Sequence, residues 1–112
     1  MFRKGKGRDI NNCGTPDILE VPIKKLKDET GKNLHDTEKP VDLMKILIEN
    51  STNKGETVLE PFAGIGSTIL AGVELGRKVI ASEIDEKYVN VVIDRLDKIE
   101  KVNLVQNDLF CF

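Results

Sequence analysis

The 112-residue sequence predicts an α/β fold in which three parallel strands are flanked by helices. From residue 40 onward, short apolar runs rich in β-branched residues alternate with segments whose apolar residues recur at helical spacing. A loop that contains two glycines separates the first apolar run from the helix after it. Strands that alternate with helices in this way form parallel sheets, and such sheets bind ligands at the carboxyl ends of their strands.

Residues 1–38 are predicted to form an N-terminal arm that is flexible in part. They are rich in Gly, Lys, Asp and Asn. Their one β-like run, ILEVPI at residues 18–23, contains Pro22 and therefore suits a sheet edge. The first eight residues carry basic side chains and no acidic one, between glycines that favour a solvated terminus. Contact of this terminus with phosphate groups is the alternative.

Residues 39–112 are predicted to form the α/β domain. Its first helix covers residues 40–50, because Pro40 suits a first helical position. The apolar face of this helix consists of Val41, Met44, Leu47 and Ile48. Asn and Gly within residues 51–55 end the helix. The later elements are a strand at 57–62, a helix at 67–75, a strand at 78–85, a helix at 86–99 and a strand at 102–108. The inward residues of the last helix are Val89, either Val92 or Ile93, Leu96 and Ile99.

The composition excludes several classes of protein. Hydrophobic residues make up 39% and charged residues 32%, as in ordinary globular proteins. The formal net charge of -2 provides no overall basic field for nucleic acid or an anionic membrane, so any such contact has to be local. Cys13 and Cys111 lack the spacing of zinc ligands, so we expect reduced thiols and no metal site. No apolar run is as long as a membrane span or a secretory signal, and we expect a cytoplasmic protein.

The loop FAGIG at residues 62–66 follows the first strand of the domain. Gly64 and Gly66 have no Cβ, so backbone N–H groups there can come close to a ligand. A dinucleotide-binding loop would need a third glycine at position 69, where Ile69 stands, and this argues against NAD or FAD. A tight strand-to-helix turn without a ligand is the alternative reading of the two glycines.

Two carboxylates stand at the ends of the first two strands. Glu83 lies about 20 residues past the loop, where an acidic side chain accepts hydrogen bonds from ribose hydroxyls. Glu60 ends the first strand, where it suits the ammonium group of an amino acid. A ribose at one end and an amino acid at the other describe S-adenosyl-L-methionine. The alternative for Glu83 is a solvated carboxylate beside Asp85 and Glu86.

Three motifs follow one another along this part of the chain: HDTEKP from residue 35, LEPFAGIGST from residue 59 and SEID from residue 82. In this order they resemble the cofactor-binding part of the adenine-N6 and cytosine-N4 DNA methyltransferases, in the branch whose cofactor site lies toward the C-terminus. The resemblance covers residues 35–96 and implies a partial Rossmann-like S-adenosylmethionine methyltransferase fold. The sequence has Asp36 where proline is common in that family, and Glu60 where aspartate is usual.

The same resemblance implies roles for single residues. Glu60 and Lys39 would hold the ammonium and carboxylate groups of the cofactor, and Glu83 its ribose. Further cofactor contacts would come from Thr37, Phe62, Ala63, Gly64, Gly66, Thr68 and, near the adenine amino group, Asp108. Lys39 has an alternative as a surface lysine at a helix start, and we interpret His35 as structural.

Catalysis in the resembled family depends on an Asp/Asn/Ser-Pro-Pro-aromatic loop, which does not occur among these residues. The four prolines are nowhere adjacent, and EPF at residues 60–62 belongs to the cofactor loop. We therefore assign no catalytic residue and expect the S-adenosylmethionine-binding portion of a DNA amino-methyltransferase, inactive alone. DNA would be bound through a complete enzyme or a complementary chain, as in restriction-modification. A non-catalytic binding or regulatory protein derived from a methyltransferase is the alternative, and a remnant of a small-molecule methyltransferase fits HDTEKP less well.

Three parallel strands with these helices would leave one sheet edge open. Unpaired N–H and C=O groups on an edge are templates for association. Parallel strands are also usually buried on both faces, and both VLEPF and KVIAS have the apolar content of such strands. We therefore expect a homodimer, or association with a missing half.

Overall fold

The structure is a computed structural model that describes residues 9–35 and 37–99. The elements of this part are α1 (Val41–Ser51), β1 (Thr57–Glu60), α2 (Ser67–Glu74), β2 (Lys78–Ala81) and α3 (Glu86–Asp97). The two strands are parallel, which confirms the predicted α/β class. The sheet of the described residues has two strands and not three. The third predicted strand, residues 102–108, lies outside the described residues.

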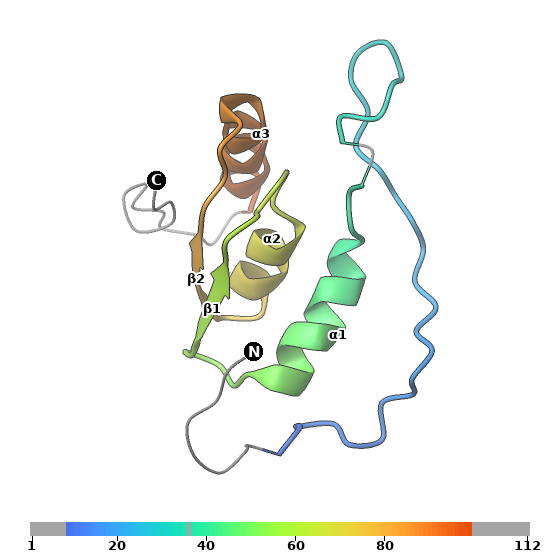
Figure 1. The fold of residues 1–112 in the computed structure, drawn as a ribbon, viewed down its shortest axis with the longest axis vertical. Coiled ribbons are helices and arrows are strands. Elements are labelled where there is room, and N and C mark those ends of the chain that lie inside the picture. The colour runs from blue at the N-terminus through green and yellow to red at the C-terminus, as the bar shows by residue number, and fades with distance from the viewer. Residues whose placement is uncertain (1–8, 36, 100–112) are drawn as a thin grey trace.

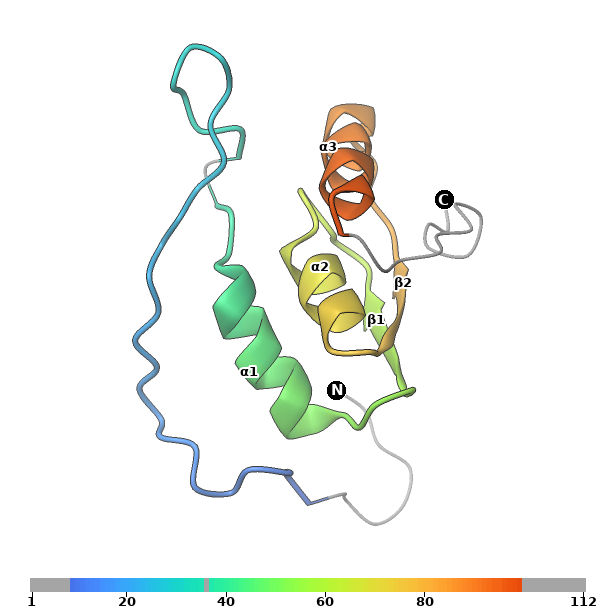
Figure 2. The same cartoon turned by 180° about the vertical axis from the view of Figure 1, so that it is seen from behind.

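The elements form layers, as Figures 1 and 2 show. α2 packs against the sheet, α1 lies beside α2, and the segment before α1 runs along the far side of that helix. α3 stands at the carboxyl ends of the strands. Gly72 brings α2 close to β2, because a Cβ at this position would lie 2.5 Å from Cγ2 of Val79.

The hydrophobic core lies between the sheet, α2 and α3. Ile69 of α2 and Val92 of α3 are completely buried, and Leu96 is nearly so. Of the two residues that the sequence left open, Val92 is therefore the one in the core, and Ile93 is only half-buried. Leu47 departs from the prediction for α1, because 47% of it is exposed. Ile48, which was predicted for the same face, is buried and lies near Gly72.

One face of the sheet carries exposed apolar side chains. Leu59 and Ile80 are opposite each other in the strand register, and their exposed fractions are 71% and 39%. The described part of the chain therefore exposes apolar surface, as the apolar content of both strands predicts for a sheet that lacks a covering partner. The reason is that α1, α2 and α3 leave this face uncovered in the described part of the chain.

The segment before α1 forms no strand at residues 18–23, contrary to the sequence-based prediction. A strand needs a neighbour, and no described strand lies beside this segment, whose Ile18 and Ile23 are exposed. The segment is nevertheless anchored to α1. The Asn11 side chain donates hydrogen bonds to the carbonyl oxygens of Glu49 (2.8 Å) and Thr52 (2.7 Å) at the helix end. These bonds satisfy carbonyls that have no partner within the helix.

Candidate cofactor site

A cavity of about 310 Å³ lies at the carboxyl ends of β1 and β2. This is the edge of a parallel sheet where ligands bind. The cavity is lined by His35, Thr37, Glu38, Lys39, Glu60, Phe62, Ala63, Gly64, Ile65, Ser67, Thr68, Glu83 and Tyr88. These residues include every predicted cofactor contact except Gly66 and Asp108, and Asp108 lies outside the described residues.

The glycine loop is held by a backbone hydrogen bond to the end of β2 and by another within the loop. The Ala63 N–H donates to the Ser82 carbonyl (3.0 Å), and the Gly66 N–H donates to the Ala63 carbonyl (2.9 Å). Gly64 and Gly66 have φ values of +56° and +86°, which side-chain-bearing residues rarely adopt. The loop can therefore make its tight turn only with glycine-like backbone freedom at these two positions.

Gly66 serves packing and does not line the cavity. A Cβ on this residue would lie 2.7 Å from Cγ2 of Val92, inside van der Waals contact. Gly66 therefore lets α3 approach the start of α2. Gly64 differs, because it lines the cavity and a Cβ on it would lie 3.7 Å from Nε2 of His35, in ordinary van der Waals contact. Gly66 is thus needed for the packing of α3, whereas Gly64 borders the cavity. The spacing of the two glycines in the sequence did not reveal this difference.

Glu60 is held at the cavity wall by two hydrogen bonds. Its Oε1 accepts from the Phe62 N–H (3.0 Å), and its Oε2 accepts from the Thr68 hydroxyl (3.0 Å). Each carboxylate oxygen has a second lone pair, so Glu60 keeps an acceptor position on both oxygens. The Thr68 hydroxyl donates to Glu60 and so orients this carboxylate.

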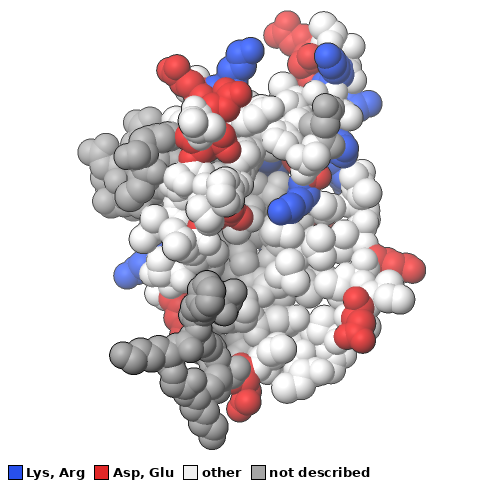
Figure 3. Space-filling view, viewed as in Figure 1, with Lys and Arg blue, Asp and Glu red and all other residues white. Residues whose placement is uncertain are grey.

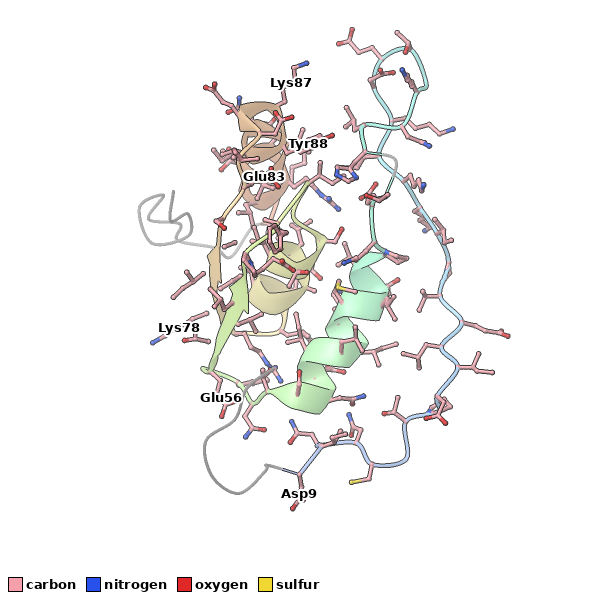
Figure 4. All side chains as sticks on the ribbon, viewed as in Figure 1. Asp9, Glu56, Lys78, Glu83, Lys87 and Tyr88 are labelled. Atoms are coloured by element: carbon pink, nitrogen blue, oxygen red, sulfur yellow. The ribbon has the colours of Figure 1, made fainter. Side chains whose placement is uncertain are left out.

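Glu83 is fixed in a similar way between the loop and the start of α3. Its Oε2 accepts from the Gly64 N–H (2.7 Å), and its Oε1 accepts from the Asp85 N–H (2.9 Å). Figure 4 shows Glu83 and Tyr88 close together where β2 leads into α3. The bond to Gly64 excludes a freely solvated Glu83, which was the alternative for this residue.

The segment before α1 forms the opposite wall. The Thr37 N–H donates a hydrogen bond to Nδ1 of His35 (3.1 Å). Nε2 of the same ring lies on the side of Gly64. Lys39, the residue before Pro40, also lines the cavity and is exposed.

Tyr88 is a lining residue that the sequence analysis missed. Its ring lies 4.7 Å from the His35 ring, centroid to centroid, and the two planes are tilted by 53°. Its position was a signal, because the first turn of the helix after an acidic strand end borders the same edge of the sheet. Ser67 and Glu38 were also missed, and His35 was interpreted only as structural.

The described residues contain neither a cluster of metal ligands nor a membrane-spanning helix. No group of three or more His, Cys, Asp or Glu among residues 9–35 and 37–99 could hold a metal ion. In the same part of the chain, no helix is long and apolar enough to cross a membrane.

Comparisons with known proteins agree with this geometry. The family model described as DNA methylase matches residues 5–94. The Type II methyltransferase M.HindIII of Haemophilus influenzae is 43% identical over 76 residues, which are 68% of this chain and 24% of the relative. The DNA adenine methyltransferase YhdJ of Escherichia coli is 36% identical over 98 residues, 86% of this chain and 33% of the relative. The chain thus spans a third or less of the length of these relatives.

A solved structure shows the same fold over much of the chain. The M1.HpyAVI–SAM complex has a TM-score of 0.60 and 31% sequence identity, covering 78% of this chain and 42% of that one. Family match, relatives and fold agree with the motifs at residues 35–40, 59–68 and 82–85. The chain therefore belongs to the family of adenine-N6 and cytosine-N4 DNA methyltransferases.

Proposed function

We propose that this chain binds S-adenosyl-L-methionine as the cofactor-binding portion of a DNA amino-methyltransferase that acts on adenine-N6 or cytosine-N4. The observation that supports it most is the convergence of Glu60, Glu83 and the loop at 62–66 on one cavity. These residues come from the ends of two different strands, where such a cofactor would be expected.

The charges around the cavity suit this cofactor. S-adenosylmethionine carries an ammonium, a sulfonium and a carboxylate group, so its net charge is positive. The lining includes Glu60 and Glu83, whose free lone pairs would accept from the ammonium group and from ribose hydroxyls. Lys39 lies at the same cavity and would pair with the carboxylate. The exposed ring of Phe62 would cover the base.

A cavity of about 310 Å³ is at the lower end of the usual range for small-molecule sites, roughly 300–1,000 Å³. The bound cofactor supplies an electrophilic methyl group. The described residues bind and orient it, and we assign none of them to proton transfer.

DNA would be bound through a complete enzyme or a complementary chain. Figure 3 shows Lys and Arg side chains on the visible face interleaved with acidic ones, without a uniform basic surface. Together with the net charge of -2, this makes strong DNA binding by these residues alone unfavourable.

Calorimetry with the 112-residue chain tests the proposal. We expect S-adenosylmethionine to bind and NAD to bind more weakly, because Ile69 occupies the position of the third glycine of a dinucleotide loop. Tighter binding of NAD, or no heat with either S-adenosylmethionine or S-adenosylhomocysteine, would contradict it. A non-catalytic protein that retains the cofactor is the second candidate, and a neighbouring chain that supplies a Pro-Pro loop would argue against it.

A further inference from the structure

Arg95 of α3 connects two walls of the cavity from behind. Its Nη1 donates to the Ile65 carbonyl in the glycine loop (2.8 Å) and lies 3.3 Å from Oε1 of Glu38. Glu38 and Ile65 both line the cofactor cavity, whereas Arg95 faces a second cavity on the other side of Glu38. A single guanidinium group therefore contacts the loop and the segment that carries Thr37 and Lys39.

Glu38 extends the connection to the segment before α1. Its Oε2 accepts a hydrogen bond from the Leu26 N–H (2.7 Å), while its Oε1 faces Arg95. The exposed fractions of the side chains are 3% for Glu38 and 15% for Arg95. Burial lowers the pKa of the Arg95 guanidinium, and the Glu38 carboxylate opposes this effect. Arginine nevertheless stays protonated in proteins, so the pair is ionic.

Stability alone does not account for such a pair. A buried ion pair loses much of its Coulomb energy to desolvation, and apolar residues of similar volume are often at least as stabilising. What the pair does provide is a fixed geometry among three segments that are far apart in the sequence. In the described part of the chain, His35 also lies near Gly64 of the loop and beside Tyr88 of α3.

We propose that Arg95 and Glu38 are positioning residues for the cofactor. Arg95 sets the loop through Ile65, and through Glu38 it sets the distance between the loop and the wall formed by residues 35–39. Neither side chain needs to touch the cofactor chemically for this role. The inference rests on the proposed function for the identity of the ligand, but not for the contacts themselves.

The test compares Arg95→Lys and Glu38→Gln with a matched control. Arg77→Lys is the control, because Arg77 is also partly buried and donates to the carbonyl oxygens of Leu75 (2.7 Å) and Thr52 (2.9 Å), but does not line the cavity. We expect each test variant to bind S-adenosylmethionine about fivefold more weakly, and the control to bind as the parent does. The double variant should bind S-adenosylmethionine about as tightly as either single variant. The two losses should not add, because breaking the pair from either side removes the same connection.

Amide hydrogen exchange in the ligand-free chain provides the second readout. In Arg95→Lys the Gly66 N–H, which bonds to Ala63, should exchange faster, while the Leu75 N–H in α2 should not change. A general loss of stability would accelerate both amides. Unchanged affinity in both test variants, or unchanged exchange at Gly66, would overturn the inference. If the parent chain binds no S-adenosylmethionine, the proposed function fails, and the exchange experiment still decides whether Arg95 positions the loop.

Discussion

At the scale of single residues, backbone contacts turn two flexible carboxylates into fixed acceptors. Glu60 and Glu83 each use both oxygens on neighbouring donors, three of which are backbone N–H groups. A carboxylate held in this way loses less conformational freedom when a ligand arrives, which favours binding. The same bonds leave a second lone pair on each of these oxygens for a ligand.

Glu83→Ala should weaken S-adenosylmethionine binding by about tenfold or more, because hydrogen bonds to a charged group contribute roughly 1.5–3 kcal/mol. Glu83→Gln should give an intermediate loss, since it keeps an acceptor but no charge. Calorimetry measures both. The control is Glu86→Ala, an exposed glutamate in the first turn of α3 that does not line the cavity. Equal affinity in the Glu83 and Glu86 variants would remove Glu83 from the site.

Gly66→Ala should lower the free energy of unfolding by about 2 kcal/mol, because its Cβ would meet Val92 and its φ is +86°. Urea unfolding followed by circular dichroism measures the change. Gly14→Ala is the matched control, since nothing lies within 4 Å of its Cβ. In the background of Val92→Ala, the added cost should shrink but not vanish, because the backbone strain remains. If Val92→Ala removed the whole cost of Gly66→Ala, backbone strain at residue 66 would contribute nothing to the loss of stability.

At the scale of elements, the backbone carbonyl groups at the end of α1 accept hydrogen bonds from a residue far away in the sequence. Its carboxyl end is contacted by Asn11, whose N–H donates to the Asn50 carbonyl (2.9 Å) in addition to the two side-chain bonds. The Arg77 side chain reaches the same region from the turn before β2, through Thr52. α1 is thus connected at one end to both the N-terminal segment and the sheet.

Asn11→Ala should lower the free energy of unfolding by roughly 1 kcal/mol, the usual net contribution of such hydrogen bonds. It should also accelerate amide exchange in residues 11–15, because the anchor of that segment is removed. Asn90→Ala in α3 is the control, an exposed helical position where alanine is a better helix former. Unaltered exchange in the Asn11 variant would mean that other contacts hold the segment to α1.

At the scale of the whole molecule, the sheet face that residues 9–35 and 37–99 leave uncovered predicts self-association. The Leu59→Thr/Ile80→Thr double variant removes its exposed apolar side chains and places β-branched threonine, which suits strands, at both positions. We expect light scattering over a dilution series to show a homodimer for the parent and a monomer for the variant. Ile18→Thr is the control, an exposed apolar residue outside the sheet. A parent that stays monomeric at high concentration would contradict the prediction.

The isolated chain should transfer no methyl group to DNA, because no residue of the described cavity is assigned to accept hydrogen bonds from the amino group of an extruded base. Incorporation of labelled methyl groups into unmethylated DNA measures this. The positive control is a complete enzyme of the same family in the same assay. Turnover that persists after rigorous purification would show that a substitute for the Pro-Pro loop lies in the chain.

The sequence by itself determined the order of elements and most of the site. Apolar periodicity placed the helices at 41–51, 67–74 and 86–97 to within two residues, because helix ends are set by local signals. Motif positions identified most of the cavity wall, because the carboxyl ends of neighbouring parallel strands meet at one edge.

Only the tertiary structure decided the contacts between segments distant in the sequence. Tyr88 beside His35, Val92 under Gly66 and Arg95 behind Ile65 all join α3 to residues at least 26 positions away. Periodicity fixes which face of a helix is apolar, but it does not fix what lies opposite that face. The exposure of Leu59 on the sheet of the described residues has the same origin, because burial of a strand depends on neighbours that its own sequence does not specify.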